Sequence, residues 1–137
     1  MECTTKFGRF LRIFFGCHAR PERSFYFRGK QFPICARCTG ELVGLIAGIP
    51  IAICLGYPKF WIAVLMMLPL VIDGFVQRFT KYESNNRRRL ITGILFGVAF
   101  IFMLIYFHRT CIYIAGWILK LFVKDAERID RAMELFL

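Results

Sequence analysis

Three long apolar windows constrain the fold of this chain more than any other feature. They run from Leu42 to Tyr57, from Phe60 to Val76 and from Leu90 to Phe107. Each is close to the length that a helix needs to cross a hydrocarbon core about 30 Å thick. A fourth window, Cys111 to Val123, has only thirteen residues and is short for a span. We therefore predict an all-α integral membrane protein, a multi-pass bundle of three to four transmembrane helices in the cell membrane.

The segments that flank these windows divide the chain into three parts. Basic and apolar residues alternate at helical spacing over Lys6–Phe15, which predicts an interfacial helix. Proline and glycine punctuate residues 17–34, which predicts an irregular, aromatic-rich Cys/His loop. We thus expect a cytoplasmic interfacial helix and Cys/His loop over residues 1–37 and a helical bundle over 38–123. Residues 124–137 are expected to form a cytoplasmic amphipathic tail.

The basic residues predict the orientation, because Lys and Arg beside spans are retained in the cytoplasm. With four spans and both termini inside, 17 of the 19 basic residues are cytoplasmic, and only Lys59 and Arg109 lie outside. Membrane flanks and anionic lipid headgroups thereby account for the formal net charge of +10. The lipid bilayer is the expected partner, and we expect no nucleic-acid binding, which would need basic residues clustered on one face.

Four ligand-type residues lie just before the first window. Cys17 and His18 are adjacent, and Cys35 and Cys38 form a C-x-x-C pair. This set matches the ligands of a tetrahedral zinc site, structural if all four residues bind and open if only three do. In a reducing cytoplasm the cysteines are expected as thiols or thiolates rather than as a disulfide. The sequence predicts zinc at the cytoplasmic face.

Polar residues inside the windows cluster near the same end of the spans. Asp73 and Gln77 are one helical turn apart, and Glu41 follows Cys38 by three residues. Ionisable groups within a membrane are costly and mark functional sites by default. The alternative for Asp73 is a structural one, as partner of an arginine such as Arg23 or Arg89 or of Thr92.

Four ordered motifs carry a resemblance to a known family. They are Cys17–Phe25, Cys35–Gly40, Asp73–Gln77 and Asn85–Asn86 with Arg89, Thr92 and Gly93. They resemble a small prokaryotic membrane-protein family, the domain-of-unknown-function family numbered 2085, over roughly Cys17 to Gly97. The resemblance implies that these residues form a shared site and implies no activity.

Three functions fit these patterns. The first is a metal-assisted enzyme acting on a lipid or isoprenoid phosphate headgroup, with Asp73 or Glu41 as base and Arg23 and Arg89 on the phosphate. The catalytic candidates are then Asp73, Glu41, Arg23, Gln77 and Arg89. The second is a thiol oxidoreductase that uses Cys35 and Cys38. The third is a non-enzymatic component, such as a transporter accessory or metal-sensing subunit, in which zinc is structural.

Overall fold

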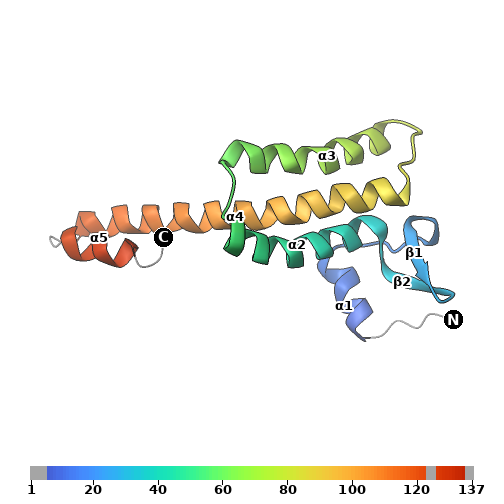
Figure 1. Ribbon diagram of the computed structural model, residues 1–137, viewed down its shortest axis with the longest axis horizontal. Helices are drawn as coiled ribbons and strands as arrows, with labels where there is room; N and C mark the ends of the chain where they lie inside the picture. Colours follow the sequence, from blue (N-terminus) through green and yellow to red (C-terminus); the bar gives the residue numbers. More distant parts are fainter. Residues whose placement is uncertain (1–5, 123–125, 135–137) are drawn as a thin grey trace.

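The computed structural model describes residues 6–122 and 126–134, which form five α-helices, one short 3-10 helix and one β-hairpin (Figure 1). The elements are α1 (Lys6–Phe14), η1 (Pro21–Arg23), β1 (Ser24–Phe27), β2 (Lys30–Cys35), α2 (Ala36–Leu55), α3 (Phe60–Phe79), α4 (Asn86–Phe122) and α5 (Ala126–Glu134). Helices α2, α3 and the first half of α4 lie side by side as a bundle. The α1 helix and the hairpin cover one end of this bundle, and α4 projects from the other.

Three helices of the described chain, α2, α3 and α4, are long and apolar enough to cross a membrane. This confirms the helical membrane fold. The fourth window forms no separate helix, because it continues the third window within the 37 residues of α4. His108, Arg109 and Thr110 interrupt the apolar sequence, but none of them breaks a helix as proline or glycine would. The charge of Arg109 ends the apolar window in the sequence, but the helix continues to Phe122.

The α2 and α4 helices approach each other through glycine. A Cβ atom on Gly44 would lie under 3.0 Å from the backbone of Ile94 and Gly97, and one on Gly97 would meet the backbone of Glu41 and Gly44. Small residues at four-residue spacing let helix backbones pack closely in membranes, where dispersion and not water exclusion drives association. This contact fixes the depth of α2, and thus of the cysteines at its start, relative to α4.

The loop between α2 and α3 defines the other end of the bundle. The Tyr106 hydroxyl donates to the Pro58 carbonyl at 2.7 Å, and Arg109 donates to the Tyr57 hydroxyl. From residue 110 to 122, α4 extends about 20 Å past this loop, at about 1.5 Å per residue. Helix α5 packs back along this extension.

The two terminal helices therefore lie at opposite ends of the bundle (Figure 1). This differs from the expectation that the N-terminal region and the tail share one side, which required the fourth window to cross the membrane on its own. Residues 124–125 and 135–137 of that tail, and residues 1–5, lie outside the described residues.

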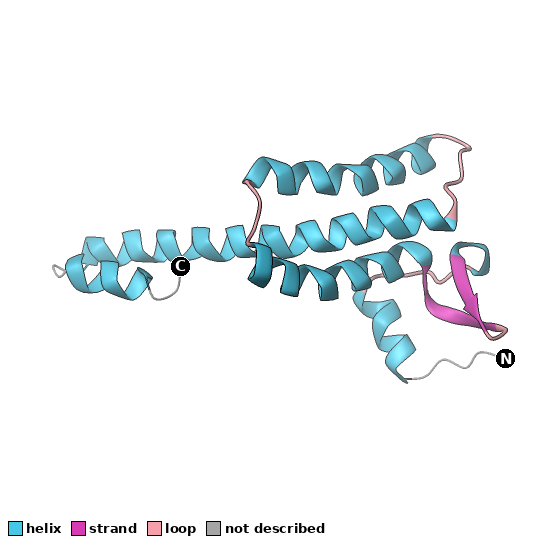
Figure 2. Ribbon diagram, in the orientation of Figure 1, coloured by secondary structure: helices cyan, strands magenta, loops and turns pink. Residues whose placement is uncertain are grey.

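The N-terminal region is more regular than the sequence predicted. The helix predicted near the N-terminus is present as α1, which buries Leu11 and leaves Phe7, Phe10 and Phe14 exposed. The expected irregular loop instead contains a two-stranded antiparallel hairpin, shown in magenta in Figure 2. Arg28 and Gly29 both have positive φ, as a two-residue type I′ hairpin turn requires.

Candidate metal centre

The end of α1 places Cys17. Gly16 adopts a left-handed conformation with φ of 57°, and its N–H donates to Ile13 while that of Cys17 donates to Arg12. These two bonds form a Schellman motif, in which a glycine reverses the chain and satisfies the last helical carbonyls. Cys17 is thereby turned from the end of α1 toward the start of α2.

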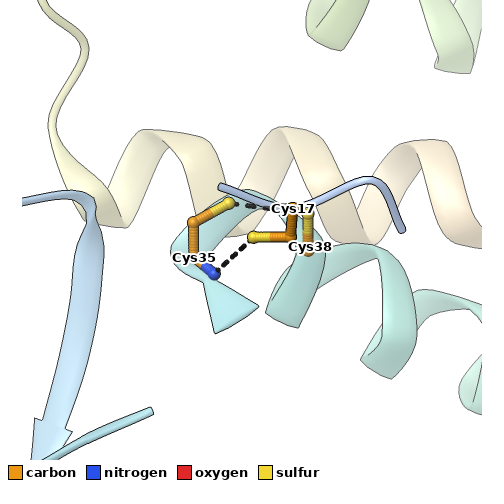
Figure 3. A group of neighbouring side chains, drawn as sticks. All are labelled: Cys17, Cys35 and Cys38. Atoms are coloured by element: carbon orange, nitrogen blue, oxygen red, sulfur yellow. Dashed lines mark hydrogen bonds between the residues drawn. The ribbon is translucent and has the colours of Figure 1, made fainter. Parts of the chain in front are cut away.

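The end of β2 and the first turn of α2 supply the other two cysteines. Cys35 is the last residue of β2 and precedes α2, and Cys38 lies in the first turn of that helix. The sulfur atoms of Cys17, Cys35 and Cys38 all lie within 4.8 Å of one another (Figure 3). Around them, Leu11 of α1 and Ile34 of β2 pack with Cys38 in a small hydrophobic core. Three separate elements thus converge on one cluster of thiols.

The three sulfurs are close enough together to hold one metal ion. Three thiolates bound to zinc at about 2.3 Å in a tetrahedral arrangement lie about 3.8 Å apart. The Cys35 and Cys38 sulfurs are 3.5 Å apart, and the sulfur of Cys17 accepts the backbone N–H of Cys35 at 3.1 Å and that of Ala19 at 3.4 Å. Backbone donors aimed at a sulfur stabilise its thiolate form, which is the form that binds metal. The hydrogen bond with Cys38 also lowers the pKa of the Cys35 thiol to about 5, against the opposing effect of burial.

His18, the fourth predicted ligand, does not join this group. Its side chain is exposed, and among the described residues the cluster contains only the three cysteines. His18 nevertheless lines the same cavity, of about 290 Å³, together with Cys17, Cys35 and Cys38. The structure therefore brings together three of the four predicted ligands and places the fourth at the rim.

A buried polar chain lies beside the cluster, between the three spans. Arg37 of α2 forms an ion pair with Asp73 of α3 at 2.5 Å, and the Gln77 amide donates to the same carboxylate oxygen at 2.6 Å. Arg89 of α4 donates to the Gln77 carbonyl at 3.1 Å. Asp73 and Arg89 are both buried. One carboxylate therefore connects α2 and α3, and Gln77 extends the connection to α4.

Arg37 is the site residue that the sequence analysis missed. The partners considered for Asp73 were Arg23, Arg89 and Thr92, and the ion pair is formed by none of them; the Thr92 hydroxyl instead donates to backbone carbonyls of its own helix. Arg37 lies between the two cysteines of the C-x-x-C pair, at the end of α2 that meets the last turns of α3. A basic residue at the depth of a lone intramembrane aspartate was the signal that could have identified it.

A basic cavity of about 610 Å³ lies next to this chain. It is lined by Arg23, Arg37, Gly74, Gln77, Arg78 and Phe79. The Nε atoms of Arg23 and Arg37 are buried and have no hydrogen-bond partner within the described part of the chain, although Arg23 also pairs with Glu83 at 2.6 Å. Arg23 and Arg37 line the cysteine cavity as well, so both cavities share these two guanidinium groups.

The two predicted carboxylates occupy different surroundings. Asp73 is engaged by Arg37 and Gln77. Glu41 is half-buried in α2, one turn after Arg37, and its side chain makes no hydrogen bond or ion pair with the described residues. The carboxylate that remains free beside the thiols is therefore that of Glu41.

Comparison with known proteins places this site in a family. The family described as "Predicted membrane protein (DUF2085)" matches residues 17–103. An uncharacterized protein of Methanothermobacter thermautotrophicus is 38% identical over 92 residues, covering 64% of this chain and 83% of that protein. An uncharacterized protein of Methanocaldococcus jannaschii is 32% identical over 95 residues, covering 65% of this chain and 61% of that protein. No solved structure matches the chain. The matched region begins at Cys17 and includes every residue of the site.

Proposed function

This chain belongs to the DUF2085 family of predicted membrane proteins, and we propose that it is a zinc-dependent membrane enzyme acting on the phosphate of a lipid headgroup. One observation carries the proposal. The three cysteine sulfurs converge in a cavity whose walls also contain Arg20, Arg23 and Arg37. Thiolates that attract a cation and guanidinium groups that attract an anion therefore face the same space.

The donor set favours an open zinc site. Cys17, Cys35 and Cys38 would hold the ion, and the fourth position would face the cavity that His18 borders. Three protein ligands with one open position are typical of catalytic zinc, whereas four ligands are typical of structural zinc. When bound, zinc would supply a Lewis acid next to any phosphate oxygen that enters the cavity.

The arginines are suited to hold that phosphate. Arg23 and Arg37 each keep a buried N–H without a partner in the described chain, and Arg78 lies in the same basic cavity. Guanidinium groups recognise phosphate through paired, charge-assisted hydrogen bonds. Of the arginines expected to bind phosphate, Arg23 keeps that role in this proposal, whereas Arg89 and Gln77 support Asp73.

The carboxylates then take separate roles. Asp73 orients Arg37 through their ion pair, so it acts as a positioning residue. Glu41 is unpaired in the described chain and is the better candidate for a base, because it can accept a proton without losing an ion pair. Both roles depend on the site lying where headgroups are found, at the end of the spans.

The basic residues support a cytoplasmic site. With three spans, 13 of the 19 basic residues fall in the segments on the cysteine side, including the run Arg87–Arg89 at the start of α4. The excess of basic residues on the cysteine side is smaller than in the four-span topology, but it still favours the cytoplasm for that side. A cytoplasmic location would also keep the thiols reduced and able to bind metal.

Binding of a phosphate headgroup tests this proposal. Zinc-loaded protein in nanodiscs should bind a lipid phosphate monoester more tightly than phosphatidylcholine, and Arg23→Gln should weaken that binding. Arg109→Gln, at the other end of the bundle, is the matched control and should leave it unchanged. Equal affinities for both lipids in all three proteins would refute a headgroup site. If the parent protein contains zinc and Cys35→Ser lowers its stability without changing headgroup binding, the zinc is structural.

A thiol oxidoreductase is the second candidate, and one observation favours it. Cys35 has a lowered pKa and its sulfur lies 3.5 Å from that of Cys38 at the start of a helix. A reactive C-x-x-C pair has the same features. Thiol trapping of the protein in intact cells separates the two candidates, because a Cys35–Cys38 disulfide and bound zinc exclude each other.

A further inference from the structure

The second half of α4 has no counterpart in the bundle. Helix α2 ends at Leu55 and α3 begins at Phe60, and the loop between them contacts α4 at Tyr106 and Arg109. Residues 110–122 extend about 20 Å beyond that loop. This extension carries large apolar side chains, including Trp117 and Phe122, which are 65% and 83% exposed. A bilayer matched to α2 and α3 does not reach them.

One stripe of exposed residues runs along α4 from the bundle into this extension. Its members repeat at alternating spacings of four and three residues. We call them the α4 seam: Phe100, Leu104, Phe107, Cys111, Ile114, Ile118 and Leu121. All seven are exposed in the single chain. Spacing of four and three is the a/d heptad pattern of a two-stranded coiled coil.

The rest of α4 is used within the chain. In the bundle, Val98 and Phe102 pack against Ala63 of α3, while Gly93 and Gly97 meet α2. In the extension, α5 covers a different face: Gly116 lies against Met133. Ile112, Gly116 and Leu119 also line an apolar cavity of about 540 Å³ with Ile129 of α5. Contacts within the described chain therefore cover one face of α4 in the bundle and the face around Gly116 in the extension. The seam lies outside both of these faces, as do the exposed side chains of Tyr113 and Trp117.

Charged residues avoid the seam. Arg109 and Lys120 are the charged residues between Phe100 and Phe122, and both point to partners in the same chain, Tyr57 and Asp130. The heptad positions that flank the seam, e and g, hold uncharged residues and His108. Trp117 and Phe122 occupy such positions and widen the apolar stripe where lipid does not cover it. No like charges would oppose each other if two seams met.

We propose that the α4 seam is the interface of a parallel homodimer of this chain. Every copy has the same orientation in the membrane, so two copies present identical seams at the same depth. In a parallel coiled coil each seam residue meets its own counterpart, which the two-fold symmetry of a homodimer requires. A bilayer matched to α2 and α3 covers only the part of the seam that lies within the bundle, whereas a second copy of α4 covers it from Phe100 to Leu121.

Cys111 provides the test, because it lies within the seam. In full-length protein in its native membrane, with Cys3 and Cys54 changed to serine, mild oxidation should join two chains through Cys111. Cysteine moved to the seam positions Ile114 or Ile118 in a Cys111→Ser background should also form dimers. The matched off-seam variants Tyr113→Cys and Leu119→Cys in the same background should form no covalent dimer, and neither should Cys111→Ser alone.

A measurement without cross-linking completes the test. Ile118→Glu places a charge in the seam and should convert the dimer to a monomer in single-molecule photobleaching, whereas Tyr113→Glu should leave the dimer intact. The proposal is overturned if seam and off-seam cysteines cross-link equally, which indicates random collision. It is also overturned if no seam position cross-links, or if spin-labelled lipid contacts Ile114 and Ile118 because the extension lies on the bilayer.

Discussion

Removing the charge of Asp73 should destabilise the bundle while leaving its shape intact. In Asp73→Asn the carboxylate that pairs with Arg37 at 2.5 Å becomes a neutral amide. The new side chain can still accept from Gln77, so the change isolates the ion pair. Two unit charges about 4 Å apart interact by about 4 kcal/mol at an effective dielectric constant of 20.

Solvent reduces that value. The Asp73 side chain is 4% exposed but that of Arg37 is 25% exposed, so part of the interaction is screened. Breaking a buried pair usually costs about 3–5 kcal/mol, because the remaining charge stays buried without a partner. We therefore expect Asp73→Asn to lower the free energy of unfolding by about 3 kcal/mol.

A second substitution provides the control. Arg37→Met combined with Asp73→Asn removes the unpaired charge and should recover most of the lost stability, since buried pairs are often replaceable by apolar residues. The assay is reversible unfolding in mixed micelles or steric trapping in bicelles, with expression level recorded. If the free energy of unfolding of Asp73→Asn stays within about 1 kcal/mol of that of the parent, the ion pair does not hold the spans together.

Three further predictions follow from contacts elsewhere in the chain. Gly97→Ala should destabilise the bundle by about 1–3 kcal/mol, because its Cβ would meet the backbone of Glu41. The control Gly74→Ala would meet only the far end of the Arg37 side chain and should be neutral or slightly stabilising. Thermal unfolding in detergent compares the two variants, and equal effects would contradict close α2–α4 packing. Gly16→Ala should weaken zinc binding, because a φ of 57° costs about 1–2 kcal/mol for a residue with a Cβ. Chelator competition measures the zinc affinity, and an unchanged affinity would show that the Schellman turn does not position the metal ligands. Membrane-impermeant labelling of intact cells should reach cysteines placed at Lys59 and Arg131 but not at Glu22 or Lys81, since three spans place the first pair on one side; labelling at Glu22 would reverse the orientation.

The sequence predicted the parts of this fold that depend on composition along one segment. Apolar windows of spanning length identified the three long helices, and the C-x-x-C pair with Cys17 identified the thiol cluster. The end of α4 was mispredicted because Arg109 interrupts hydropathy without interrupting helical hydrogen bonds. The hairpin was missed because its turn, Arg28–Gly29, lies among prolines that also signal irregular loops.

Contacts between segments were harder to predict than the segments. The pairing of Arg37 with Asp73 depends on how α2 and α3 are each placed against α4, and glycine contacts fix this placement for α2. His18 illustrates the converse case: its residue type and spacing suit a ligand, yet the reversed chain after Gly16 leaves it at the rim of the cavity. The sequence identifies which residues are of a metal-ligand type, whereas the direction in which each side chain points depends on the backbone conformation.

The metal content of the purified protein tests the central claim most directly. Protein purified without chelator should contain one zinc per chain, because three thiolates converge within 4.8 Å. Cys35→Ser with Cys38→Ser should lose the metal and lower the stability of the protein, since a bound metal contributes to folding free energy. Cys54→Ser with Cys111→Ser, which changes two exposed cysteines remote from the site, should retain it. Metal-free parent protein carrying a Cys35–Cys38 disulfide under thiol-trapping conditions would contradict the account.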